Sequence, residues 1–119
     1  MKTLAVKIET LDAAGHAFVE ALQSAQAGRQ VKLAHSIGFA SYAAMHRVLS
    51  PARLDIVRTM AGQGPMSIRE VARRVGRDFK AVHTDVTTLL NAGVIDRDGG
   101  EIVFPYDRIH FEFDIEVAA

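Results

Sequence analysis

The 119-residue sequence contains no cysteine and no long apolar run. The absence of cysteine removes disulfide bonds and thiolate chemistry, which argues against a secreted, disulfide-stabilised scaffold. The first residues, MKTLAVKIETLD, are interrupted by charged side chains and match neither a signal peptide nor a membrane span. We therefore expect a cytoplasmic protein that does not contact a membrane.

Net charge is also lacking, because 14 basic residues balance 14 acidic ones. These charges are nevertheless segregated along the chain. Residues 53–80 contain seven Lys or Arg against three acidic residues, whereas the last fifteen residues contain one Arg against four acidic residues. A basic block inside a neutral chain indicates an anionic partner for that block, although a solvated helix surface has the same pattern.

What is present is the composition of a globular domain, with 49% apolar and 24% charged residues. Residues 1–37 are expected to form a β-α-β arm for dimerisation or partner binding. Alternation of apolar and polar residues predicts strands near residues 2–9 and 30–37. Apolar residues at helical spacing between Thr10 and Gly28 predict a helix that includes Phe18. The apolar side of the first strand consists of Leu4, Val6 and Ile8, which are expected at a dimer or partner interface together with Phe18.

Residues 38–107 are expected to form a second unit that begins with three helices. The spacing predicts helices over residues 39–49 and from Pro51 to about Ala61. A third helix follows Ser67, which forms a capping-box pattern with Glu70, and it ends at Gly76. Its arginines Arg69, Arg73 and Arg74 are expected to point outward.

The segment GRDFKAVHTDVTTLLNAGVI predicts a fourth helix, which starts almost at once after Gly76. Two short helices joined by a Gly-containing turn are typical of a helix-turn-helix. The buried stripe of this helix is expected to contain Phe79, Val82, Val86, Leu89 and Leu90. The opposite face contains Lys80, Thr84, Thr87 and Thr88, with Ala81 and His83 at its flanks and Asp85 at its edge.

Residues 94–104 predict a β-hairpin around the turn Asp98-Gly99-Gly100, so the expected fold is an α+β winged helix-turn-helix. In the remaining residues, 108–119, apolar and polar side chains alternate. This pattern predicts a strand that joins the arm in an additional small sheet. Its apolar face must be buried, within one chain or between two, so we expect it at a dimer or partner interface. That face contains Phe111, Phe113 and Ile115.

The polar face of the fourth helix suits the major groove of double-stranded DNA. Short side chains allow close approach, hydroxyls and methyl groups contact base edges, and cations contact phosphate or guanine. Ala81, Thr84 and Thr88, with Arg77 and Lys80, supply these groups. The three arginines of the preceding helix are placed for backbone phosphates. The alternative is a winged helix that binds only protein.

The run from FASYAAMHRVL to NAGVID, followed by VFPYDRI, resembles the MarR-like winged-helix transcriptional regulators of bacteria and archaea. This resemblance covers nearly the whole chain and is strongest over residues 39–97 and at Pro105-Tyr106-Asp107. It implies a homodimer that binds a palindromic operator, commonly as a repressor. The base-reading residues that it implies are Arg77, Lys80, His83, Thr84 and Thr87.

The hairpin departs from the basic wing of that group. Arg97 is its one basic residue, against Asp96, Asp98 and Glu101, so Arg97 is the single wing residue expected at DNA. Members of such groups are often encoded beside a toxin. The resemblance therefore implies an alternative function as an antitoxin that binds a cognate toxin protein through the arm and the last strand.

Catalytic and metal sites are not expected. The five histidines are scattered, and no HExxH pattern occurs. His110, Glu112 and Asp114 share one strand face, but a solvated face explains them more simply than a metal site. No nucleophile pattern is present, so we expect neither an enzyme nor a cofactor.

Overall fold

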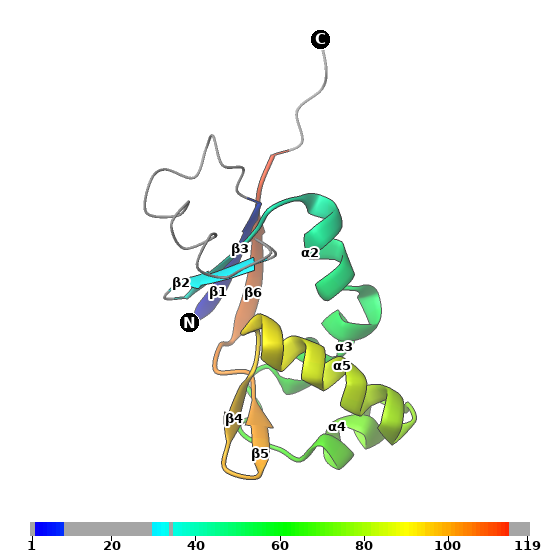
Figure 1. Cartoon of the computed structure of the whole chain (residues 1–119). Helices are drawn as coiled ribbons and strands as arrows, with labels where there is room; N and C mark the ends of the chain where they lie inside the picture. The colour runs from blue at the N-terminus through cyan, green and yellow to red at the C-terminus, as the bar shows by residue number, and fades with distance from the viewer. Residues whose placement is uncertain (1, 9–29, 34, 115–119) are drawn as a thin grey trace.

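The structure is a computed structural model that describes residues 2–8, 30–33 and 35–114. The described residues form an α+β fold of four helices and two small sheets. The larger sheet and the two-stranded sheet lie toward opposite ends of the molecule, with helices beside them (Figure 1). The helix expected between Thr10 and Gly28, with Phe18, and the end of the last strand, with Ile115, lie outside the described residues.

The larger sheet contains β1 (Thr3–Ile8), β2 (Gln30–Leu33), β3 (Ser36–Phe39) and β6 (Arg108–Glu112), in the order β2-β3-β1-β6. Strand β1 lies in the centre and runs parallel to both β3 and β6. The expectation that the C-terminal strand joins the N-terminal strands in one small sheet is confirmed. The register places Leu4 beside Ile109 and Val6 beside Phe111.

The prediction of one strand over residues 30–37 is wrong in one respect, because this segment contains two strands. Strands β2 and β3 are antiparallel neighbours. His35 lies between them with a positive φ of 62°, in the left-handed region where a chain can reverse tightly. The His35 ring also contacts Tyr106, with ring centroids 5.8 Å apart. Alternation of apolar residues continues across such a turn, so the sequence pattern alone did not indicate the break.

The helices are α2 (Tyr42–Val48), α3 (Pro51–Met60), α4 (Ile68–Val75) and α5 (Phe79–Ala92). Each helix starts after a residue whose side chain accepts a hydrogen bond from a backbone N–H in the first turn. This bond supplies a partner for an N–H group that has none within the helix. The capping residues are Ser41, Ser50, Ser67 and Asp78. The helix predicted from Phe39 therefore starts three residues later, after Ser41, because Phe39 completes β3 and is fully buried.

A single core connects the sheet and the helices. The β1 side chains Leu4 and Val6 have no exposed surface, and the same holds for Ile56 of α3 and Val86 of α5. The structure corrects the prediction that Leu4 and Val6 lie at a dimer or partner interface, because a single chain already buries both side chains completely. Ile8 is half-buried, and Phe111 remains exposed.

The hairpin consists of β4 (Asp96–Asp98) and β5 (Glu101–Val103). Met66, just before α4, exchanges two backbone hydrogen bonds of 2.9 Å with Ile102 of β5. These bonds hold the hairpin beside the start of α4, and the burial of Ile102 and Met66 attaches it to the core.

Gly76 is expected to contribute stability through its backbone alone. It ends α4 with φ 69° and ψ 34°, and a Cβ built on it meets nothing within 4 Å. Gly76→Ala should therefore lower the free energy of unfolding by about 1 kcal/mol, the cost of a left-handed alanine, in a urea titration. Gly100→Ala is the matched control, since Gly100 also has open space but no positive φ. Equal effects of the two substitutions would contradict this explanation.

Candidate functional site

The outward surface of α5 is open to solvent. Lys80, Ala81, His83, Thr84 and Thr87 are exposed, and Thr88 is half-buried. We call these six residues the α5 outer face. The prediction that they point away from the core is confirmed, and no described residue of the larger sheet covers the exposed five.

The three threonines of the α5 outer face share one side-chain arrangement. Each hydroxyl donates to the carbonyl four residues earlier: Thr84 to Lys80 at 3.2 Å, Thr87 to His83 at 2.9 Å and Thr88 to Thr84 at 3.2 Å. These bonds fix the side-chain rotamers and use the hydroxyl protons. Each threonine therefore offers a methyl group and acceptor lone pairs to a ligand.

Asp85, which was predicted at the edge of this face, is instead buried. Its side chain is 13% exposed and lies between two arginines, with Arg53 Nε 3.1 Å from Oδ1 and Arg77 Nη1 2.9 Å from Oδ2. The contact with Arg77 is an ion pair whose geometry is not that of a hydrogen bond, and both of its atoms are buried. Burial of Asp85 leaves no exposed carboxylate on α5 between Phe79 and Thr88.

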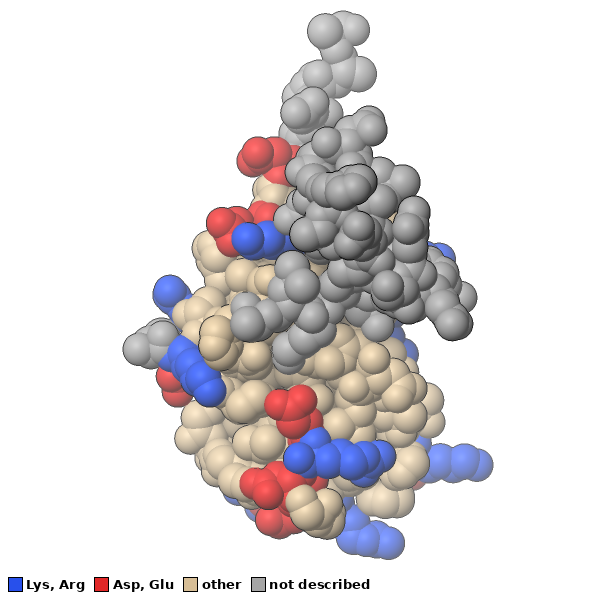
Figure 2. All heavy atoms as spheres, turned by 60° about the vertical axis from the view of Figure 1, so that its left-hand side comes forward, with Lys and Arg blue, Asp and Glu red and all other residues tan. Residues whose placement is uncertain are grey.

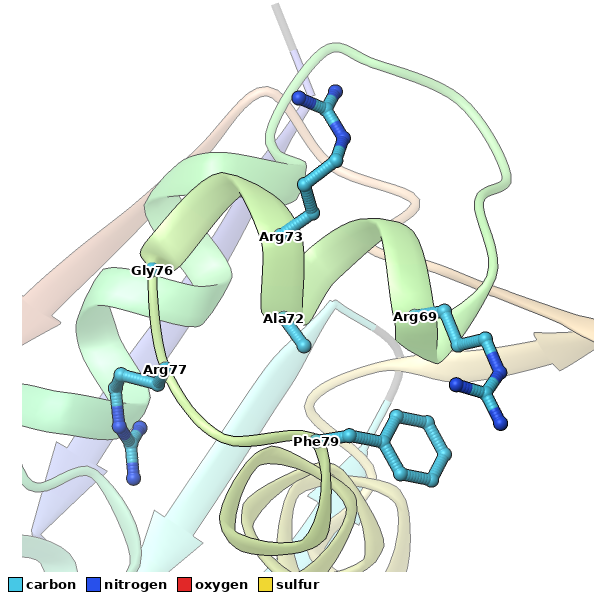
Figure 3. Close-up of a pocket in the computed structure, with 6 residues that line it drawn as sticks. All are labelled: Arg69, Ala72, Arg73, Gly76, Arg77 and Phe79. Atoms are coloured by element: carbon cyan, nitrogen blue, oxygen red, sulfur yellow. The ribbon is translucent and has the colours of Figure 1, made fainter.

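Arg77 was predicted to contact DNA bases, and this role stays a prediction, because its side chain is paired with Asp85 and is still 34% exposed. Its guanidinium is engaged with Asp85 and is directed away from Phe79 and Arg69 (Figure 3). Arg77 follows Gly76 in the short connection between α4 and α5. Its charge therefore stabilises that connection and is not part of the α5 outer face.

Phe79 departs from the predicted buried stripe, because the residue is 38% exposed. The guanidinium of Arg69 lies over its ring, 4.6 Å from the centroid, which is a cation–π arrangement. Both side chains line a shallow hollow of about 350 Å³ between α4 and the start of α5, together with Ala72, Arg73, Gly76 and Arg77 (Figure 3). Arg69 is thereby positioned next to the first turn of α5.

Arg73 and Arg74 both bind Glu70 on the exposed side of α4. Arg73 Nε lies 2.9 Å from Glu70 Oε1, and Arg74 Nε lies 2.7 Å from Oε2. The hydrogen bonds from Arg73, and then those from Arg74, lower the pKa of Glu70 to about 2. Glu70 therefore stays ionised to a lower pH than an ordinary glutamate, and it orients two cations. Arg73 keeps 71% of its side chain exposed.

The β4–β5 hairpin has mixed charge. Arg97 is exposed, as are Asp96, Asp98 and Glu101 around it. In Figure 2, acidic and basic side chains lie side by side at the end of the molecule where this hairpin is found. The hairpin therefore presents no continuous basic surface.

The described residues contain no group of three or more His, Asp or Glu side chains with the arrangement of a metal site. No helix in the same part of the chain has the length and apolar character needed to cross a membrane.

A comparison with known families matches residues 48–111 to the model of the HVO_A0114 family, which is more than half of the chain. The chain belongs to the HVO_A0114 family. The matched segment contains α3, α4, α5 and the hairpin, and thus both the α5 outer face and the arginines around Asp85. No curated protein and no solved structure matched the chain.

The ion pairs of Asp85 with Arg53 and Arg77 were not predicted. Arg53 is 32 positions away from Asp85, and no spacing rule connects two helices across such a distance. The available signal was indirect: Asp85 is the one acidic residue among those of α5. An isolated charge next to an apolar stripe indicates either an exposed edge or a buried ion pair, and only packing distinguishes them.

Asp85→Ala is expected to destabilise the protein by about 3 kcal/mol, because it leaves two largely buried guanidiniums without their carboxylate. Chemical denaturation measures the loss. Asp55→Ala is the control: Asp55 pairs with Arg58 at 2.6 Å, but both side chains are exposed, so its removal should cost less than about 0.5 kcal/mol. Similar losses in the two variants would contradict the structural role of Asp85.

Proposed function

We propose that the protein is a sequence-specific DNA-binding transcriptional regulator, acting as a dimeric repressor. The observation that supports this most directly is the α5 outer face: an exposed helix surface with short side chains, a lysine and no exposed carboxylate from Phe79 to Thr88. A solvated helix surface normally mixes both signs of charge. A surface without acids is suited to an approach to phosphates.

Helices α3, α4 and α5, with the hairpin, support a winged helix-turn-helix interpretation. Helix α5 follows α4 after three residues, and both pack against α3. The hairpin comes directly after α5 and is attached at the start of α4 through Met66. In this arrangement α5 is the helix that enters the major groove, and its first turns come closest to the bases. The similarity of residues 39–97 to MarR-like regulators agrees with this interpretation.

The first turns of α5 offer suitable base-contacting chemistry. Lys80 is exposed and can donate to guanine, and the methyl groups of Ala81 and Thr84 suit the thymine methyl. Because Thr84 and Thr87 use their hydroxyl protons within the helix, their oxygens act as acceptors for the amino groups of cytosine or adenine. His83 lies beside them as a further polar contact.

Phosphate contacts are assigned to α4. Arg69, Arg73 and Arg74 lie on its exposed side, and Glu70 neutralises one of their three charges. Such contacts fix the position of the protein on DNA without reading sequence. Arg97 is the one hairpin residue assigned to DNA, and the acids around it make deep insertion of the hairpin into the minor groove unfavourable.

The double substitution Lys80→Glu/Thr84→Glu tests the proposal. It places two carboxylates on the α5 outer face, so affinity for DNA from upstream of the protein's own gene should fall more than tenfold in a gel-shift titration at about 0.1 M salt. The thermal unfolding midpoint should stay close to that of the wild type, because both side chains are exposed. Arg47→Glu, an exposed charge reversal on α2, is the control. Unchanged DNA affinity in the double variant would refute the proposal.

Arg73→Ala tests the phosphate assignment separately. Loss of one phosphate contact should weaken binding to specific and nonspecific DNA alike and should reduce the salt slope, log K against log salt, by about one. Arg58→Ala serves as the control, since Arg58 is equally basic and exposed but lies on α3 and pairs with Asp55. A loss confined to one DNA sequence would instead assign Arg73 to a base.

A further inference from the structure

Strand β6 forms one edge of the larger sheet, and no described strand pairs with its outer side. The Arg108 N–H donates toward β1, to the Lys2 carbonyl at 3.4 Å. Backbone groups alternate in direction along a strand, so the N–H and C=O groups of Ile109 and Phe111 point to the outer side. An edge of this kind is a template for another strand.

One face of the β6 edge is apolar and incompletely covered. Phe111 is 36% exposed and lines two grooves between β6 and the helices. The larger groove, of about 410 Å³, borders α3 and is lined by Leu54, Val57, Ala61 and Ile109 among others. The smaller one, of about 240 Å³, borders α2 and includes Tyr42, which is 49% exposed, and Phe113. Exposed aromatic surface beside an unpaired strand marks an interaction site.

The other face of β6 is charged, and its two ends have opposite signs. Arg108 starts the strand, Glu112 ends it and His110 lies in the middle, all three exposed. Arg108 Nε donates to Thr3 Oγ1 at 2.7 Å, and its guanidinium forms no ion pair with a described carboxylate. Glu112 likewise forms no ion pair with a described cation, and its neighbour on β1 is Lys7. A strand with a cation at one end and an anion at the other complements a second copy of itself when the two run antiparallel.

We propose that β6 is the dimer interface: a second copy pairs its own β6 with this edge, antiparallel, about a twofold axis at His110. Arg108 then faces the partner's Glu112, and by symmetry Glu112 faces the partner's Arg108. On the apolar face, the partner's Phe111 lies opposite Ile109, at the groove along α3. The two four-stranded sheets become one continuous sheet, and every strand residue from Arg108 to Glu112 is paired. This inference rests on the proposed function only for the expectation of two copies, and self-association is measured without DNA.

Charge exchange across the interface provides the test. Sedimentation velocity on the full chain should show a dimer for the wild type at micromolar concentration. Arg108→Glu and Glu112→Arg should each weaken dimerisation about tenfold or more, because each places like charges opposite one another at two symmetric positions. The double variant Arg108→Glu/Glu112→Arg restores opposite charges and should return the dimerisation constant to within about threefold of the wild type.

Glu101→Arg is the matched control, because it reverses an exposed charge on β5, outside the larger sheet, and should not change dimerisation. Circular dichroism and thermal melting of each variant establish that it is folded. A wild-type protein that stays monomeric at about 100 µM overturns the proposal. Failure of the double variant to recover, or a dimer that tolerates both single reversals, overturns it as well.

The same samples separate this inference from the proposed function. A dimer with the expected charge dependence that does not bind DNA would support the β6 interface and refute the regulator. The opposite result is DNA binding that requires Lys80 and Thr84, together with dimerisation that is unchanged by substitution of Arg108 or Glu112. This result would support the regulator and refute this interface.

Discussion

The arrangement of α5 depends on the burial of one carboxylate. Asp85 contacts Arg53 of α3 and Arg77 of the connection that precedes α5, so the ion pairs join three parts of the chain. Because side chains on a helix keep fixed angular positions, an inward Asp85 also sets which residues of α5 face outward. Asp85 lies one turn after Ala81, so the exposure of Lys80 and Thr84 is coupled to a buried contact at the border of the α5 outer face.

Burial of such charges is costly unless their remaining donors are satisfied. For Arg53, the structure meets this requirement by extending the network. Arg53 also donates to the carbonyls of Arg47 and Val48, the last residues of α2, whose carbonyls lack partners within their own helix. A guanidinium at a helix C-terminus interacts favourably with the helix dipole as well. Arg53 thus connects α2 to α5, and α2 is the helix that follows β3 of the larger sheet.

The two proposed surfaces occupy different parts of the molecule. The β6 edge belongs to the larger sheet, whereas α5 begins on the far side of the molecule from that sheet (Figure 1). A dimer formed through β6 would leave the first turns of α5 accessible in both copies. The proposed functions of the two surfaces, self-association and DNA binding, are therefore compatible in one assembly.

The sequence by itself determined the local elements: the limits of α3, α4 and α5, the hairpin, and the outward direction of Lys80 and the threonines. Caps such as Ser67 and glycines such as Gly76 act within one helical turn, so a short window of sequence contains their full signal. Only the tertiary structure decided the break at His35, the core position of Val6 and the ion pairs of Asp85. Each of these depends on residues that are distant in sequence and become neighbours only after packing, which periodicity along the chain does not encode.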